Sequence, residues 1–244
     1  MSFDDYVTSI IAKRIAGDIV FSDDPASSLR KWREYFEVSQ ADLARLMKVS
    51  PSVVSDYEKG RRAPGIRFIQ RYVWALLEAD RLRGWRKVSG MAASLGIIPG
   101  VVIDMMEFSK PLKLDELVEA VKGVLLTPEV RSDRLIYGYT IVDSIKTILT
   151  LSGIQYSILF GMTPERAIVF TKVQAGRSPM VAVRVSPVKP SVVVIHGPRD
   201  KVDPLAVEIA RRDNVPLILS LARDVDELKS LLRIAASKTS SQLT

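Results

Sequence analysis

The character of the sequence changes near residue 135, and this change limits the folds that the chain can adopt. Before it, apolar residues recur mostly at the spacing of amphipathic helices; after it come short runs rich in Val and Ile that end at Gly or Pro. The runs SVVVIHG (191–197) and PLILSL (216–221) flank a helical pattern at 203–213, an order that suits a parallel strand–helix–strand crossover. We therefore expect a mixed fold, with an all-α N-terminal part and a C-terminal α/β domain.

Three further runs in the C-terminal part are expected to be strands of the same sheet. They are YSILFG (156–161), RAIVFTKV (166–173) and MVAVRVS (180–186). The segment QAGRSP (174–179) is expected to be a hairpin loop between the last two. Helices are expected at 141–151, before the first of these strands, and at 225–236, after the last strand of the sheet.

Residues 40–59 combine two short helical patterns with a turn between them. Leu43, Ala44 and Met47 share one face of the first pattern, and Ala44 is small enough to let a second helix cross closely. Ser50 is a typical N-cap residue, followed by Pro51 at the first helical position. The second helix is expected to have a polar outer face and a basic C-terminal end. Such a helix fits the width of a DNA major groove.

The segment VSQADLARLMKVSPSVVSDYEKGRRAPG (38–65) resembles the helix-turn-helix of the Cro/repressor (XRE) family. The resemblance rests on the Ser39-Gln40 opening, on Ala44 in the first helix, and on the Glu-x-Gly-x-x-x-Pro exit that begins at Glu58. It implies a lambda-repressor-like helical domain over about residues 28–85. The whole chain also resembles archaeal predicted regulators that have this motif and an α/β C-terminal domain.

The family resemblance implies a role in DNA binding for individual residues. Gln40, Lys59, Arg61 and Arg62 would bind backbone phosphates, which fixes the register of the protein without reading sequence. Arg33 would form an ion pair with Glu58 that is structural. The residues facing base edges would be Ser52, Val53, Ser55 and Asp56. Among these, a serine can donate or accept, Val53 could contact a thymine methyl group, and Asp56 could accept from cytosine N4.

Two features of the segment depart from the family pattern. The tight turn usually contains glycine, whereas this chain has Lys48, and a residue other than glycine at positive φ costs on the order of 1 kcal/mol. The second helix also lacks Arg, Asn and Gln, which are the usual bidentate readers of bases. We therefore expect its specificity to depend partly on DNA shape and on phosphate contacts.

The distribution of charge also favours a polyanionic partner. The chain has a formal net charge of +7, and residues 28–90 alone carry 14 Lys and Arg against 7 Asp and Glu. This is the densest positive field in the chain, and it coincides with the motif. A basic face that is merely solvated remains the alternative.

Composition excludes several classes of protein and of site. There is no cysteine and only one histidine, which excludes disulfides, thiolate catalysis and multi-histidine metal sites. No apolar stretch approaches the roughly 20 residues needed to cross a bilayer, and the N-terminus carries acids where a signal peptide has positive charges. We expect a cytoplasmic protein without membrane association. No catalytic motif is recognised, so we expect no enzyme activity, cofactor or metal.

The single histidine lies where parallel α/β sheets often bind small anions. His196 and Gly197 end an expected strand, and Arg199, Asp200 and Lys201 follow it before a helix. Arg177 and Ser178, in the loop AGRSP, are further candidates for such a pocket. A loop histidine satisfied by a backbone hydrogen bond, in a domain used for dimerisation, is the alternative.

These observations predict a domain organisation and a function. The expected parts are an N-terminal amphipathic helix and linker (1–27), the helix-turn-helix domain (28–88), a helical connector (89–132) and an α/β domain for dimerisation or ligand sensing (133–244). We expect a sequence-specific transcriptional regulator that binds double-stranded DNA as a homodimer and responds to a small anionic effector. The alternative is a coactivator-like protein that bridges transcription factors and the basal machinery.

Overall fold

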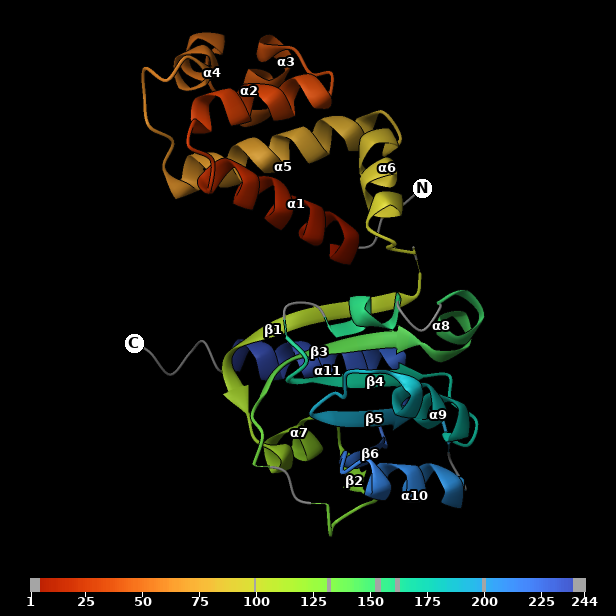
Figure 1. The fold of residues 1–244 in the computed structure, drawn as a ribbon. Helices are drawn as coiled ribbons and strands as arrows, with labels where there is room; N and C mark the ends of the chain where they lie inside the picture. Colours follow the sequence, from red (N-terminus) through yellow and green to blue (C-terminus); the bar gives the residue numbers. More distant parts are fainter. Residues whose placement is uncertain are drawn as a thin grey trace. The chain divides into compact units, whose positions relative to one another are not determined.

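The computed structural model describes residues 5–98, 100–130, 133–151, 155–160, 163–198 and 201–238. It divides into two compact units, Met1–Ile97 and Ile98–Thr244, and each is described by itself (Figure 1). Across the part of the chain that the structure describes, no helix combines the length and the apolar character needed to span a lipid bilayer.

All regular secondary structure among the described residues of unit 1 is helical. Its helices are α1 (Asp5–Val20), α2 (Pro25–Tyr35), α3 (Gln40–Met47), α4 (Pro51–Glu58), α5 (Ile66–Leu82) and α6 (Arg86–Ser94). Ile11, Ile15 and Ile19 recur every four residues in α1, are fully buried, and form the face of α1 that packs in the core with α5. The N-terminal helix therefore belongs to the core of the helix-turn-helix unit.

Unit 2 is built on a six-stranded sheet. Its strands are β1 (Val102–Leu112), β2 (Gly123–Leu125), β3 (Ile136–Asp143), β4 (Arg166–Thr171), β5 (Val192–His196) and β6 (Leu217–Ser220). Their order across the sheet is β1-β3-β4-β5-β6-β2. The central strands β3 to β6 are parallel, and the edge strands β1 and β2 are antiparallel to their neighbours.

Helices cover both faces of this sheet (Figure 1). On one face, α7 (Leu114–Ala120) and α11 (Val225–Lys238) bury leucines against alternate strand residues such as Ile141 and Val169. On the other face, Ile168 and Phe170 of β4 meet Tyr156 and Val183. This second layer consists of the short 3-10 helix η1 (Gln155–Phe160), α8 (Ser144–Thr150), α9 (Arg177–Val185) and α10 (Pro204–Arg212). The expected fold class, a helical domain followed by an α/β domain, is confirmed.

Arg166 is the largest fully buried side chain in unit 2. Its guanidinium donates to the Glu107 carboxylate over 2.8 Å and to the Phe160 carbonyl oxygen over 2.5 Å. A Cβ atom at Gly138 would lie 2.5 Å from Arg166 Nη2, so the glycine provides room for the buried charge. Glu107 and the carbonyl groups compensate the cost of removing the guanidinium from water.

Several secondary-structure predictions for the C-terminal part are wrong. The run at 180–186 is not a strand but most of α9, and the expected hairpin loop before it leads into the first turn of that helix. Two parallel strands, β4 and β5, must be joined by a crossover, which a hairpin loop cannot supply. Met180 and Val183 face the sheet at helical spacing, while Val181 and Val185 are exposed.

Two other predictions fail because short apolar runs are ambiguous between helix and strand. The run from 156 forms η1, whose Tyr156, Leu159 and Phe160 are buried at the i, i+3 and i+4 spacing of a helix. The helix expected at 141–151 begins three residues later, since Asp143 ends β3 and accepts a hydrogen bond from the backbone N–H of Lys146 as the N-cap of α8.

The helical connector expected at 89–132 is also corrected by the structure. Among the described residues of this segment, α6 and α7 supply the helices. The longest strand of the sheet, β1, and the strand at the opposite edge, β2, lie in the same segment. β1 alternates poorly because it is an edge strand with register shifts, between Val102 and Asp104 and between Glu107 and Leu112. Residues up to Ile97 belong to unit 1 and those from Ile98 to unit 2.

Candidate nucleic-acid interface

Helices α3 and α4 form a compact pair joined by a tight turn. Ser39 caps α3 by accepting a hydrogen bond from the Asp42 N–H over 3.0 Å, and Leu43, Ala44 and Met47 are buried. In α4, Pro51 occupies the first turn, and Val54 and Glu58 are the buried residues. The rest of α4 is at least partly exposed, as the amphipathic pattern predicts.

The turn between the two helices is made by Lys48, whose φ of 53° and ψ of 49° are left-handed. The N–H of Val49 donates to the Ala44 carbonyl oxygen over 3.0 Å, which closes the end of α3. Arg71 of α5 donates to the Met47 carbonyl oxygen at the same helix end. These contacts hold the turn in a conformation that a lysine does not favour by itself.

We expect Lys48→Gly to stabilise unit 1 by up to about 1 kcal/mol, because glycine adopts positive φ without steric strain. The measurement is the midpoint of urea unfolding followed by tryptophan fluorescence. A lower midpoint for the glycine variant would show that the Lys48 side chain makes a contact that outweighs its backbone strain.

Glu58 is the centre of a buried hydrogen-bond cluster beneath α4. Arg33 binds it in bidentate fashion, with Nε donating to Oε1 over 2.8 Å and Nη2 to Oε2 over 2.9 Å. Tyr72 and Gln40 each donate a further hydrogen bond of 2.8 Å to the carboxylate. Four donors from three other helices therefore meet one carboxylate and fix α4 against α2, α3 and α5.

This cluster shifts the titration of its members. Burial is the largest single influence on Glu58 and by itself would raise its pKa, but the hydrogen bonds and the positive charge of Arg33 outweigh burial, so the pKa of Glu58 is lowered. Burial, followed by the charge of Glu58, raises the pKa of Tyr72. The tyrosine therefore remains a hydrogen-bond donor to an ionised carboxylate.

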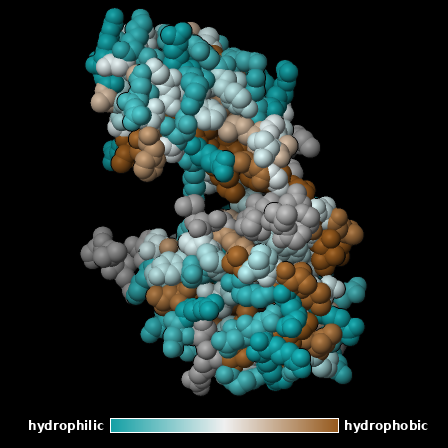
Figure 2. Space-filling model, in the orientation of Figure 1, coloured by the Kyte–Doolittle hydropathy of each residue, from teal (hydrophilic) through white to brown (hydrophobic). Residues whose placement is uncertain are grey.

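The outer face of α4 presents the residues expected to read bases. Ser52 is exposed, and Val53, Ser55 and Asp56 are partly exposed. The Ser50 and Ser52 hydroxyl oxygens lie 2.8 Å apart, so the N-terminal end of α4 presents two adjacent hydroxyl groups. The surface over this end of unit 1 is hydrophilic in Figure 2.

The expected phosphate-binding residues lie at the ends of the same two helices. Lys59, Arg61 and Arg62 are exposed after the end of α4. Gln40 opens α3, and its amide nitrogen uses one hydrogen for Glu58, which leaves a second donor. The structure therefore places Gln40 between the buried cluster and the surface.

Asp56 is paired with the two arginines that follow α4. Arg61 Nη1 lies 3.3 Å from Asp56 Oδ1, and Arg62 Nε lies 3.9 Å from Asp56 Oδ2. The arginine side chains are more than half exposed, so these ion pairs are weak. A duplex would therefore compete with Asp56 for the same guanidinium groups.

Sequence reasoning missed several residues that hold this surface in place. Tyr72 is buried and lies 14 positions after Glu58, and nothing in the local sequence marks it as a hydrogen-bond partner of Glu58. The role of Arg71, which donates to the last turn of α3, also has no local sequence signal. Asp80 of α5 accepts hydrogen bonds from the N–H groups of Lys87 and Val88 and so caps α6. An acid near the end of a predicted helix, followed by a second helix, is a weak sequence signal for the capping role of Asp80.

The candidate effector residues that the structure describes lie after the carboxyl ends of β4 and β5. His196 is buried, and Gly197 has a φ of 138° with Val173 packed so closely that a side chain would collide with its carbonyl oxygen. Arg177 donates from Nε to Asp203, the N-cap of α10, over 2.7 Å, and Ser178 is exposed beside it. Arg199 and Asp200 lie outside the described residues.

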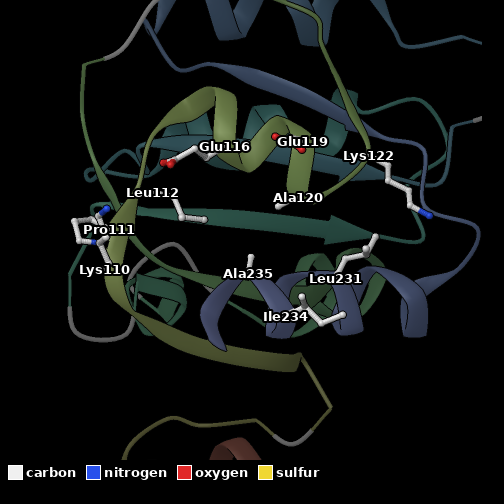
Figure 3. A pocket seen from close by; sticks show the side chains of 10 residues that line it. All are labelled: Lys110, Pro111, Leu112, Glu116, Glu119, Ala120, Lys122, Leu231, Ile234 and Ala235. Atoms are coloured by element: carbon white, nitrogen blue, oxygen red, sulfur yellow. The ribbon is translucent and has the colours of Figure 1, made fainter. Parts of the chain in front are cut away.

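Two larger cavities of unit 2 lie elsewhere. One, of about 400 Å³, has an apolar floor formed by Leu112, Leu231 and Ile234, between β1, α7 and α11 (Figure 3). The other, of about 480 Å³, is lined by residues between Lys113 and Leu135. Neither of these two cavities is lined by His196 or Arg177.

The comparisons with known proteins agree with the geometry of unit 1. A family model described as Helix-turn-helix matches residues 29–73. An uncharacterized HTH-type transcriptional regulator of Archaeoglobus fulgidus is 46% identical over 211 residues, which are 86% of this chain and 91% of the relative. One of Methanocaldococcus jannaschii is 43% identical over 228 residues, or 92% of this chain and 94% of the relative. The chain belongs to this family of HTH-type transcriptional regulators.

Membership of the family covers both units, since the two relatives align with most of the chain. The helix-turn-helix of this family member is of the XRE type, as the resemblance of residues 38–65 indicates. No solved structure gives a significant match to the chain.

Proposed function

We propose that this chain is a transcriptional regulator that binds specific DNA sequences by inserting α4 into the major groove. The observation that supports this most directly is the division of α4 into two faces. Val54 and Glu58 anchor the helix in unit 1, while Ser52, Ser55 and Asp56 lie on its accessible side. A helix held on one side and polar on the other is suited to reading base edges.

The accessible residues would contact two different parts of the DNA. Gln40, Lys59, Arg61 and Arg62 would bind phosphates and set the register. Ser52, Val53, Ser55 and Asp56 would contact base edges and determine sequence preference. None of the second group makes the bidentate contact to guanine that arginine makes, so DNA shape would contribute to specificity.

The role of Asp56 can be tested by removing its charge. We expect Asp56→Asn to raise affinity for unrelated DNA by several-fold, because Arg61 and Arg62 lose their intramolecular partner and the surface becomes more positive. The base preferred by the protein at one position of its site should change at the same time. The measurement is fluorescence anisotropy with a selected site and with a scrambled site. Asp42→Asn, which alters an exposed acid on α3, is the control. Equal affinities for native and Asp56→Asn chains would exclude a role for this carboxylate.

The coactivator-like alternative predicts a different binding pattern. A bridging protein that recognises DNA only through its basic surface would bind the selected and scrambled sites equally, and its affinity would fall steeply with salt. The anisotropy titration therefore separates the two functions.

Unit 2 is proposed to supply dimerisation, so that two copies of α4 read half-sites about one helical turn apart. A small anionic effector is proposed at the carboxyl ends of β4 and β5. Its support is the exposed Arg177, which would exchange Asp203 for the ligand.

A further inference from the structure

Helices α8 and α9 expose an apolar surface that the fold of unit 2 does not use. Its side chains are between 41% and 78% exposed. They come from α8, α9 and the segment after α9, and are called the α8–α9 patch: Ile145, Ile148, Leu149, Val181, Val185 and Val188. The two helices contact each other, and Figure 2 shows hydrophobic surface on the side of unit 2 where Figure 1 places them.

Packing within unit 2 does not require these side chains to be apolar. The buried positions of α8 are Ser144 and Thr147, and those of α9 include Met180 and Val183. The patch therefore lies on the faces of the two helices that point away from the sheet. Monomeric proteins rarely expose contiguous apolar surface beyond a few hundred Å², and larger patches usually mark an interface.

Lys146 is an exposed charge on α8 between Ile145 and Ile148, but other charged groups around the patch are paired within the same chain. Arg184 forms an ion pair with Asp213 of 2.6 Å. The Lys189 ammonium donates to the carbonyl oxygens of Val183, Arg184 and Ser186 at the end of α9. At the start of α8, Lys172 pairs with Asp143 over 2.7 Å. A single lysine is no concentrated charge, so the patch offers little to attract a partner of opposite sign.

The apolar residues exposed on unit 1 are arranged differently. On α5, Ile66, Trp74 and Leu82 are exposed, but exposed charged residues such as Arg67 and Arg81 lie between them. Such scattered residues are normal on a protein surface.

We propose that the α8–α9 patch is the surface through which two copies of this chain form a dimer. This inference rests on the proposed function, in which two copies of α4 read two half-sites. In a two-fold interface each surface meets the same surface of its partner, so a charged patch would repel itself and a neutral apolar patch would not. A stable interface buries about 800 Å² per partner around an apolar core. The five exposed aliphatic side chains on the two helices, with Val188 after α9, are suited to form that core.

Oligomeric state is the first test, with Leu149→Asp and Val185→Asp as the variants. The native chain should sediment as a dimer at micromolar concentration. Each variant should dissociate at a concentration at least tenfold higher, because each two-fold interface would bury two unpaired carboxylates. The control is Ile234→Asp on α11, in the opposite helical layer, where the native isoleucine is also exposed (48%). Circular dichroism should show that all variants are folded.

Site-specific cross-linking gives a second readout, because the native chain contains no cysteine. Leu149→Cys should form a covalent dimer with a short bismaleimide, and Ile234→Cys should not. A monomeric native chain, or a dimer that resists both aspartate substitutions, would overturn the inference.

Selection of bound DNA separates this inference from the proposed function. If the native chain is a dimer but selects no DNA sequence, sequence-specific binding is refuted. The sedimentation of the two aspartate variants then still decides whether the patch forms the dimer. A native chain that selects DNA but sediments as a monomer would refute the patch alone.

Discussion

Glu58→Ala is expected to lower the free energy of unfolding of unit 1 by about 3–5 kcal/mol, the usual cost of breaking a buried ion pair by removing one partner. The Glu58 side chain is 1% exposed and that of Arg33 12%. Its removal leaves the Arg33 guanidinium, the Tyr72 hydroxyl and the Gln40 amide without their common acceptor. The same change releases α4 from its attachment, so DNA affinity should fall as well.

Tryptophan fluorescence makes this measurement specific to unit 1. The chain has three tryptophans, Trp32, Trp74 and Trp85, and all three lie before Ile97. A urea titration followed at these residues therefore reports the unfolding of unit 1 even if unit 2 unfolds separately. Glu34→Ala is the matched control, because Glu34 forms an ion pair with Arg30 in which both side chains are more than half exposed. It should cost less than about 1 kcal/mol. Equal losses for the two variants would contradict the account of the cluster.

The lowered pKa of Glu58 adds a pH dependence to the same experiment. Because the folded-state pKa lies below the unfolded value, the carboxylate contributes stability that is fully present above the unfolded pKa. That contribution is lost as the pH falls through the folded pKa. The native unit should therefore lose stability below about pH 4.3 more steeply than Glu58→Gln does. Parallel pH profiles would show that Glu58 is not the group responsible.

The double substitution Arg61→Ala with Arg62→Ala is expected to weaken binding to all DNA by about tenfold or more at 0.15 M salt. Two fewer phosphate contacts should also reduce the slope of log affinity against log salt concentration by about 2. Both arginines lie after the end of α4 and are exposed, so their loss should leave folding almost unchanged.

Binding should be measured by anisotropy titration at several salt concentrations. Arg30→Ala with Arg81→Ala removes the same charge from exposed positions on α2 and α5, outside the expected phosphate-binding residues, and serves as the control. The account fails if the control lowers affinity as much as the double substitution after α4 does, because binding would then depend on net charge alone.

The helix-turn-helix could be predicted from sequence because its signals are local. Ser39 and Ser50 mark the helix starts, and the buried residues Leu43, Ala44 and Met47 of α3 lie at helical spacing within one short segment. The strand–helix–strand segment formed by β5, α10 and β6 was predictable for a similar reason. Its strands are continuous apolar runs buried on both faces, and Pro204 with Asp203 marks the start of the helix.

The failed predictions concern segments whose structure is decided by distant contacts. The run at 180–186 has high β propensity, but it becomes α9 because β4 and β5 are parallel and need a helical crossover. β1 mixes polar and apolar residues, and only its pairing with β3 identifies it as a strand. Arg166 and Tyr72 have partners 59 and 14 residues away, so no local pattern could show that they are buried.

Selection of bound sequences from random double-stranded DNA tests the central claim most directly, since it asks whether α4 reads bases at all. The account predicts an enriched motif with two-fold symmetry and half-sites about one helical turn apart. The same selection with Ser52→Ala should return a motif changed at one position in each half-site. A native chain that enriches no sequence above the starting pool would contradict the account.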